Sequence, residues 1–219
     1  MSATDTKDIE TIAASQVSES GNRYFIINKP YNILSQFIGD AEVRMLGQLD
    51  FQFPEGSHAI GRLDAHSEGL LIVTTNKRVT KLLFQSKVPH KRTYLVKVRN
   101  RVSQENLQRL RDGVQLRIDN NELWTTTPCD VQIVEKPANL FSHPFETKEY
   151  GEYTWMTLTL TEGKFHQVRK MTEAIRHRCV RLIRLSIEDL ELGDLQPGGV
   201  REIEEERFFE LLKIDGWRK

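Results

Sequence analysis

The chain has 219 residues, of which 38% are apolar and 28% charged, enough to bury the core of one large domain or two small ones, and this composition argues against global disorder. Its longest aliphatic run, residues 70–73, is far shorter than the roughly 20 apolar residues of a membrane-spanning helix. The polar stretch up to Gly21 has no apolar segment that could act as a signal peptide, so we expect a cytoplasmic protein. The 31 basic and 31 acidic residues cancel, and a net charge of zero, taken alone, argues against a nucleic-acid partner.

The N-terminal segment is predicted to be a disordered tail. Residues 1–22 contain no aromatic side chain and carry scattered Ser, Thr, Asp and Glu, a composition that does not support a packed core. We therefore expect the ordered structure to begin near Tyr24 and one folded domain to span residues 23–219.

Strands are predicted from alternating or continuous runs of apolar and β-branched residues. In chain order they lie over residues 24–27, 70–75, 94–99, 155–160 and 180–185, with shorter extended pieces at 33–37, 58–60 and 131–133. The run 70–75 is apolar enough to lie at the centre of a sheet. In the run 94–99, Tyr94, Val96 and Val98 alternate with Leu95, Lys97 and Arg99, which is typical of a half-buried strand with a basic face.

Four helices are predicted from helical spacing of apolar residues and from capping residues. They are expected over residues 76–86, 103–113, 165–175 and 204–214. Asn76 and Ser103 are the candidate N-caps of the first two, and Phe165 begins the buried stripe of the third. Because strands outnumber helices and most connections have hairpin length, we expect an α+β fold with a mixed, largely antiparallel sheet and flanking helices.

The charges are segregated along the chain. Residues 76–101 contain nine Lys and Arg and no Asp or Glu, and residues 162–184 carry a net charge of +5, so the rest of the chain carries a net charge of about −14. Such segregation is typical of a polyanion-binding face on an acidic body. The alternative is ordinary solvated Lys and Arg, which explains single charges better than a long window without a carboxylate.

Cysteine and histidine spacing gives no metal or disulfide signal. Cys129 and Cys179 are far apart in the sequence, and the six His residues show no HExxH arrangement. We expect neither a disulfide framework nor a metal site.

A glycine-flanked loop offers the chemistry of an active site. Asp64 and Arg62 lie between Gly61 and Gly69, directly before the buried strand. Active-site residues commonly lie in loops that a rigid strand holds in position. Asp64 could be a nucleophile, a general base or a metal ligand. The alternative is an Asp that forms a turn by bonding its own backbone.

Six segments, in this order, carry a family resemblance. They are Asn28-Lys29-Pro30, Gly61-Arg62-Leu63-Asp64, Ser67-Glu68-Gly69-Leu70-Leu71, Lys91-Arg92-Thr93-Tyr94, Glu162-Gly163-Lys164-Phe165-His166-Gln167-Val168-Arg169 and Leu182-Ile183-Arg184. Over residues 24–203 the chain resembles the bacterial ribosomal RNA pseudouridine synthases of the small-subunit synthase A family. The resemblance implies the pseudouridine synthase fold, with a central active-site cleft, and the isomerisation of uridine to pseudouridine.

Within the family, the synthase E type is the most similar. Many members begin with a separate RNA-binding module, but only about 22 residues precede Tyr24 here, so we expect no such module. The E type implies a specific uridine of 23S ribosomal RNA as target. We expect no cofactor, because the sequence shows no cofactor motif and the isomerisation is redox-neutral. We also expect a monomer that binds ribosomal RNA and does not bind membranes.

The resemblance assigns three catalytic residues. Asp64 corresponds to the essential aspartate, and whether it attacks the base, attacks the sugar or takes a ribose proton stays open. Arg169 corresponds to the arginine that keeps this carboxylate ionised in a dry pocket. Tyr94 corresponds to the tyrosine that stacks on the target base.

Further residues are expected to bind the RNA substrate. Leu182 is expected to lie under the uracil, and Arg62 to fill the gap left by the flipped base, unless it pairs with Asp64 or Glu68. Three residues are expected to shape the rim of the pocket: Lys29, His166 and Gln167. Lys91 and Arg92 belong to the basic window that is expected to hold phosphates.

Three other functions stay open. The chain could modify another structured RNA, or it could be a non-catalytic RNA-binding or ribosome-assembly protein with the same fold. A third hypothesis treats Asp64 and Glu68 as the paired carboxylates of a glycoside hydrolase. That hypothesis leaves the basic windows unexplained.

Overall fold

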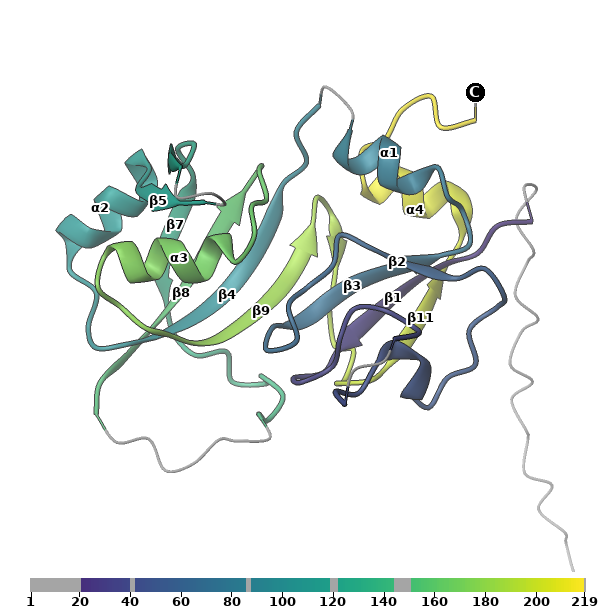
Figure 1. Cartoon of the computed structure of the whole chain (residues 1–219), viewed down its shortest axis with the longest axis horizontal. Coiled ribbons are helices and arrows are strands. Elements are labelled where there is room, and N and C mark those ends of the chain that lie inside the picture. Colours follow the sequence, from purple (N-terminus) through teal and green to yellow (C-terminus); the bar gives the residue numbers. More distant parts are fainter. Residues whose placement is uncertain (1–20, 40–41, 86–87, 119–121, 144–150, 219) are drawn as a thin grey trace, which may run out of the picture.

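The computed structural model describes residues 21–39, 42–85, 88–118, 122–143 and 151–218, so nearly all of the predicted tail lies outside the described residues. Within these ranges the chain forms eleven strands and four α-helices (Figure 1). The strands are β1 (Tyr24–Lys29), β2 (His58–Ile60), β3 (Glu68–Thr74), β4 (Arg92–Arg99), β5 (Gln115–Arg117), β6 (Leu123–Thr125), β7 (Asp130–Val134), β8 (Tyr153–Leu160), β9 (Cys179–Ile187), β10 (Leu190–Glu191) and β11 (Val200–Ile203). The helices are α1 (Val79–Phe84), α2 (Gln104–Asp112), α3 (Gln167–Ala174) and α4 (Glu205–Leu211), with a short 3-10 helix, η1 (Leu46–Gln48).

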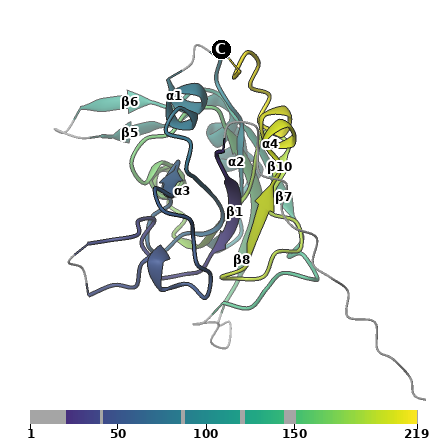
Figure 2. The same ribbon diagram turned by 90° about the vertical axis from the view of Figure 1, so that its right-hand side faces the viewer.

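Nine strands form one sheet in the order β11-β1-β3-β9-β4-β8-β7, with β2 also paired to β3 and β10 to β9. β5 and β6 form a separate two-stranded sheet, which projects from the body in Figure 2. Among the described residues, every pair of neighbouring strands is antiparallel except β3 and β9. The predicted α+β fold with a mixed, largely antiparallel sheet is confirmed.

The parallel contact between β3 and β9 joins the two halves of the sheet. It is only two residues long, with Glu68 opposite Ile183 and Gly69 opposite Arg184. The later residues of β3, 72–74, pair with β2 along the same edge. Gly69 has a φ of +97°, and a Cβ there would lie 2.4 Å from the carbonyl oxygen of Arg184. Only glycine allows the two backbones to approach this closely. The glycine-flanked loop enters β3 at this junction.

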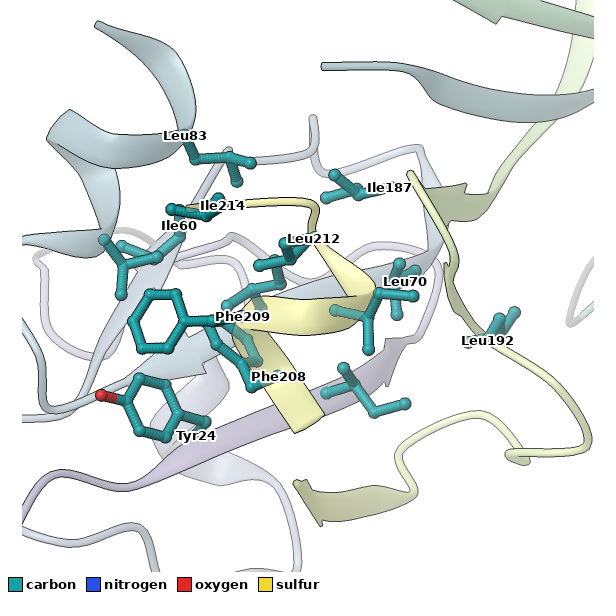
Figure 3. Packing of buried hydrophobic residues seen from close by; sticks show 14 of the residues in the cluster. Tyr24, Ile60, Leu70, Leu83, Ile187, Leu192, Phe208, Phe209, Leu212 and Ile214 are labelled. Carbon is teal, nitrogen blue, oxygen red and sulfur yellow. The ribbon is translucent and has the colours of Figure 1, made fainter. Parts of the chain in front are cut away.

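One hydrophobic core lies between the β1–β3 half of the sheet and helices α1 and α4. The ring of Tyr24 lies 4.6 Å from that of Phe208 and 5.4 Å from that of Phe209, both on α4, and Leu70 of β3 packs in the same cluster (Figure 3). The next residue of β1, Phe25, points to the opposite face and packs in a second cluster. Because both faces are covered, every residue of β1 and β3 is buried.

A third core lies between helices α2 and α3 and the β4–β8 half of the sheet. Leu107 and Leu110 of α2 and Val168 and Met171 of α3 contribute its helical side chains. The Oγ of Ser103 accepts a hydrogen bond from a backbone N–H in the first turn of α2, as its predicted capping role requires. The first core also includes Leu95 of β4 and Trp155 of β8, so it extends past β9 onto this half of the sheet. The two halves meet where β9 lies between β3 and β4.

The basic face predicted for β4 is wrong at Lys97, which is buried. Lys97 is only 5% exposed, and its Nζ lies 4.4 Å from the ring centroid of Tyr153 and 5.5 Å from that of Trp155. Both rings belong to β8, the neighbouring strand of the sheet, where Trp155 is directly opposite Lys97, and aromatic faces attract a desolvated cation. Arg99, at the end of the strand, is exposed as expected.

The helix predicted over 165–175 begins two residues later than expected. His166 has a left-handed φ of +54°, so α3 starts at Gln167, and Phe165 is 64% exposed instead of buried. Val168 and Met171 are buried as predicted. The change of direction at His166 places Phe165 and His166 outside the helix and next to the loop before β3.

Two other segments differ from the prediction. Residues 33–37 form no strand, and their one ladder contact is an isolated bridge between Leu34 and Met45. The helix expected from Asn76 is α1, which begins three residues later, at Val79. Asn76 lies in the turn before it, where its side chain donates from Nδ2 to the Tyr24 hydroxyl and accepts a hydrogen bond from the N–H of Arg78. In the described part of the chain, no helix is long and apolar enough to cross a membrane.

Candidate active site

A cleft of about 570 Å³ opens between the loop over residues 61–67 and the segment that leads into α3. Its walls also include β4, β8 and β9, so it lies at the junction of the two halves of the sheet. Six residues that the sequence predicted for the site line it: Arg62, Asp64, Tyr94, His166, Gln167 and Leu182. Four others lie outside its lining: Lys29, Lys91, Arg92 and Arg169.

The Asp64 carboxylate faces His166 across the cleft. The side chain of Asp64 is 30% exposed, and its Oδ1 lies 3.3 Å from Nε2 of His166. The imidazole stacks on the ring of Phe165, with centroids 3.8 Å apart and planes 19° from parallel. The left-handed backbone of His166 thus turns an imidazole toward Asp64 instead of continuing the helix.

The loop that carries Asp64 is held in place by hydrogen bonds to its backbone. The hydroxyl of Ser35 donates to the carbonyl of Leu63 at 2.7 Å and accepts its N–H at 3.0 Å. Within the loop, the N–H of Ser67 donates to the carbonyl of Asp64. No sequence pattern indicates that Ser35 anchors the loop, because the two segments are 28 residues apart.

A buried arginine holds both ends of the loop. Arg184 of β9 donates from Nη2 to the carbonyl of Gly61 at 2.8 Å and from Nε to that of Leu70 at 2.7 Å. Burial lowers the pKa of Arg184 below its usual value, while the nearby Tyr94 hydroxyl opposes this shift. In the sequence, Arg184 is a cation within an apolar strand pattern and belongs to the Leu182-Ile183-Arg184 motif segment, but neither feature predicts this anchoring role.

Lys29 lies beneath the loop and not at the rim of the pocket, where the sequence placed it. Its side chain is completely buried. Its Nζ donates to three carbonyl oxygens at 2.9, 2.8 and 3.2 Å, those of Pro30, Ile33 and Ala65. Burial lowers the pKa of Lys29 to about 7, against the opposing charges of Glu68 and Asp64. The rim prediction failed because β1 is covered on both faces.

Arg169 contacts the loop backbone and not the Asp64 carboxylate. Its Nη2 donates to the carbonyl of His66 at 2.7 Å and lies 3.4 Å from the hydroxyl of Ser67. Among the described residues, the basic side chain within 4 Å of the Asp64 carboxylate is the imidazole of His166. The Asp64 side chain itself stays partly exposed in the cleft.

Glu68 has a different environment from Asp64, four residues earlier. Its side chain is 2% exposed and accepts two hydrogen bonds from Arg181 of β9, at 2.9 and 3.0 Å. It is therefore committed to a buried ion pair and does not line the cleft. This excludes the hypothesis that Asp64 and Glu68 act together as a hydrolase pair.

The base of the cleft is formed by strands β4 and β9. Leu182 is opposite Val96 in the register of these strands, and Tyr94 is opposite Arg184. Gln167, at the start of α3, is buried, donates to Glu162 at 2.8 Å and accepts the N–H of Lys164 at 2.9 Å. It lines the cleft. Within the described ranges, no group of three or more potential metal ligands occurs.

Comparisons with known proteins agree with this geometry. The family model described as RNA pseudouridylate synthase matches residues 23–174. Ribosomal large subunit pseudouridine synthase E of Vibrio parahaemolyticus is 35% identical over 191 residues, which cover 86% of this chain and 77% of that protein. Ribosomal small subunit pseudouridine synthase A of Escherichia coli is 29% identical over 189 residues, which cover 86% and 73%.

A solved structure extends the agreement to the fold. The crystal structure of a pseudouridylate synthase aligns with a TM-score of 0.70 at 25% identity, over 87% of this chain and 74% of that one. The family predicted from the motifs is therefore confirmed. This chain belongs to the RNA pseudouridylate synthase family.

Proposed function

We propose that this protein converts a specific uridine of 23S ribosomal RNA to pseudouridine and that Asp64 is its catalytic residue. The observation that carries the proposal is the position of Asp64, on a fastened loop and partly exposed in a cleft at the centre of the sheet. Relatives named for the large ribosomal subunit are 33–35% identical, and those named for the small subunit are 29–30% identical. This difference supports the large-subunit RNA as substrate.

The isomerisation breaks the bond between the uracil nitrogen and the ribose, turns the base and joins it again through a ring carbon. The reaction is redox-neutral and needs no energy input, so we expect no cofactor. An ionised Asp64 can attack the base, attack the sugar or take a ribose proton. Lys29, Arg169 and Arg184 hold the loop that carries Asp64 through its main-chain carbonyls.

The cleft has side chains suited to a uracil ring. Tyr94 offers an aromatic face for stacking, and Leu182 offers an apolar surface beneath the base. Arg169 acts in this proposal by holding the loop at His66, because its guanidinium binds that carbonyl. His166 faces the carboxylate and helps to orient it.

A stacked or paired uridine must leave the RNA helix to reach Asp64, at a cost of about a few kcal/mol. Arg62 is exposed, lines the cleft and is bound to neither Asp64 nor Glu68 among the described residues. Its guanidinium can stack where the base was and bind a phosphate. Four exposed basic residues on and near α1 hold more distant phosphates: Lys77, Arg78, Lys81 and Lys91.

Site-resolved mapping of pseudouridine in ribosomal RNA, from cells with and without this gene, tests the proposal. We expect one 23S site to be lost without the gene and restored by the wild-type protein. The Asp64→Asn variant should fold and bind RNA without restoring the site. Asp112→Asn, an exposed change of the same kind on α2, should restore it.

Other results would redirect or overturn the proposal. An unchanged 23S map would shift the search to transfer RNA and small-subunit RNA. No change in any RNA would favour a ribosome-assembly protein without catalysis, and restoration by Asp64→Asn would remove Asp64 from the chemistry.

We further propose that the protein acts as a monomer in the cytoplasm, where bacterial ribosomal RNA is made.

A further inference from the structure

A second groove lies beside the cleft. Its volume is about 660 Å³, within the roughly 300–1,000 Å³ typical of ligand pockets. Arg62, Tyr94 and Lys164 line both the groove and the cleft, so the two spaces adjoin. A chain that places one unit in the cleft can place the next unit in the groove.

One wall of the groove is apolar. Phe84, the last residue of α1, is 36% exposed there, and Val88 is 62% exposed. The edge of the Phe84 ring abuts Gly61, where a Cβ would lie 2.6 Å from the ring Cζ. The ring is therefore packed against the start of the loop that carries Asp64. An exposed aromatic ring next to a cleft is a surface on which a flat ligand can stack.

The other wall is cationic. The guanidinium carbon of Arg92 lies 5.5 Å from the Phe84 ring centroid, and among the described residues its buried Nε has no hydrogen-bond partner. Lys164 and Arg62 add two further positive charges. Glu162, the single carboxylate among the described lining residues, already accepts hydrogen bonds from the side chain of Gln167 and a backbone N–H.

We propose that this groove binds a nucleotide next to the target uridine in the RNA strand, with its base on Phe84 and its phosphate against Arg92 and Lys164. A nucleotide combines a flat aromatic ring with an anion, and the groove presents the complement of both. The groove would thus hold the strand in place while the uridine lies in the cleft. This inference rests on the proposed function, since it takes RNA as the substrate.

Fluorescence of 2-aminopurine tests the stacking directly. The probe is a 23S fragment around the mapped uridine or, without a mapped site, an oligonucleotide with a single uridine, and 2-aminopurine replaces one neighbour at a time. Wild-type protein should quench one of the two positions. Phe84→Ala should abolish this quenching and weaken RNA binding about five- to a hundredfold, the usual effect of removing one stacked base. Phe84→Trp should keep both properties.

A matched control separates stacking from general loss of structure. Phe51 is 37% exposed, almost the same as Phe84, but lies outside the lining of the groove. Phe51→Ala should leave the quenching unchanged. An RNA with an abasic neighbour should bind wild type as weakly as intact RNA binds Phe84→Ala, and the two changes together should cost no more than either alone.

The outcomes distinguish this inference from the proposed function. Additive effects of the abasic site and Phe84→Ala, or no quenching at either neighbour, would overturn the nucleotide site even if pseudouridine is formed. In that case a protein segment would be the better occupant of the groove. Quenching that depends on Phe84 would uphold the site even if no uridine is converted, because binding needs no chemistry.

Discussion

Gly69→Ala should be among the most damaging small substitutions in this protein. Gly69 lies in the two-residue parallel contact that joins β3 to β9. An added Cβ would lie 2.4 Å from the carbonyl oxygen and 2.8 Å from the nitrogen of Arg184. Both atoms belong to the backbone, so no side-chain rotation relieves the overlap and the two strands must move apart.

The expected loss has two parts. The φ of +97° at Gly69 is unfavourable for any residue with a Cβ, at a cost of roughly 1–2 kcal/mol. Overpacking against a fixed neighbour adds about 1–3 kcal/mol. The free energy of unfolding should therefore fall by about 2–5 kcal/mol, a large share of the roughly 5–15 kcal/mol of a typical domain. For a chain of this size the melting temperature should fall by about 4–20 °C.

Gly56→Ala is the matched control for the backbone cost alone. Gly56 has a φ of +81°, but a Cβ there would meet no atom within 4 Å. Urea and thermal unfolding of both variants should show a loss of about 1–2 kcal/mol for Gly56→Ala and a clearly larger loss for Gly69→Ala. Equal losses would show that the β3–β9 contact tolerates a Cβ and would refute the steric argument.

Two further predictions concern the cations of the site. Lys29 has a pKa of about 7 in the folded protein and 10.5 without burial. Between these pH values the unfolded chain keeps a proton that the folded protein has lost. The free energy of unfolding should therefore rise with pH in this range, by up to about 1.4 kcal/mol per pH unit. Lys29→Met should lack this rise in urea titrations at pH 7.5 and 9.5, and parallel pH curves for the two proteins would contradict the prediction. Arg62→Ala should slow modification of a structured RNA more than that of an unpaired mimic, measured as pseudouridine formed over time, because only the structured RNA leaves a gap to fill; equal slowing would remove this role.

Sequence patterns predicted the parts of the fold that depend on local signals. The alternation of Tyr24 and Phe25 between two cores follows directly from the period of a strand. Ser103 caps α2 as its residue type predicts. The motif around Asp64 is enough to identify the family, because the types and spacing of its residues are highly specific.

Features that depend on contacts between distant segments could not be predicted. Lys97 is buried under aromatic rings of β8, which lies more than 50 residues later, and no local pattern marks a cation that is stabilised in this way. Phe165 fits a helical stripe, but the left-handed His166 ends that pattern. Arg169 was placed at the carboxylate by resemblance, whereas its guanidinium binds a carbonyl of the loop.

The contrast between Asp64 and Glu68 explains how the site keeps a carboxylate available for chemistry. Glu68 is buried on β3, where an unpaired charge would be costly, and both of its oxygens are committed to Arg181. Asp64 stays partly exposed, and its contact is a single His166 nitrogen at 3.3 Å. Arg169 and Arg184 bind main-chain carbonyls of the loop instead of the Asp64 oxygens, so they add positive potential and fix the loop while the Asp64 carboxylate stays accessible. A carboxylate held in this way can meet the uridine without first breaking a strong ion pair.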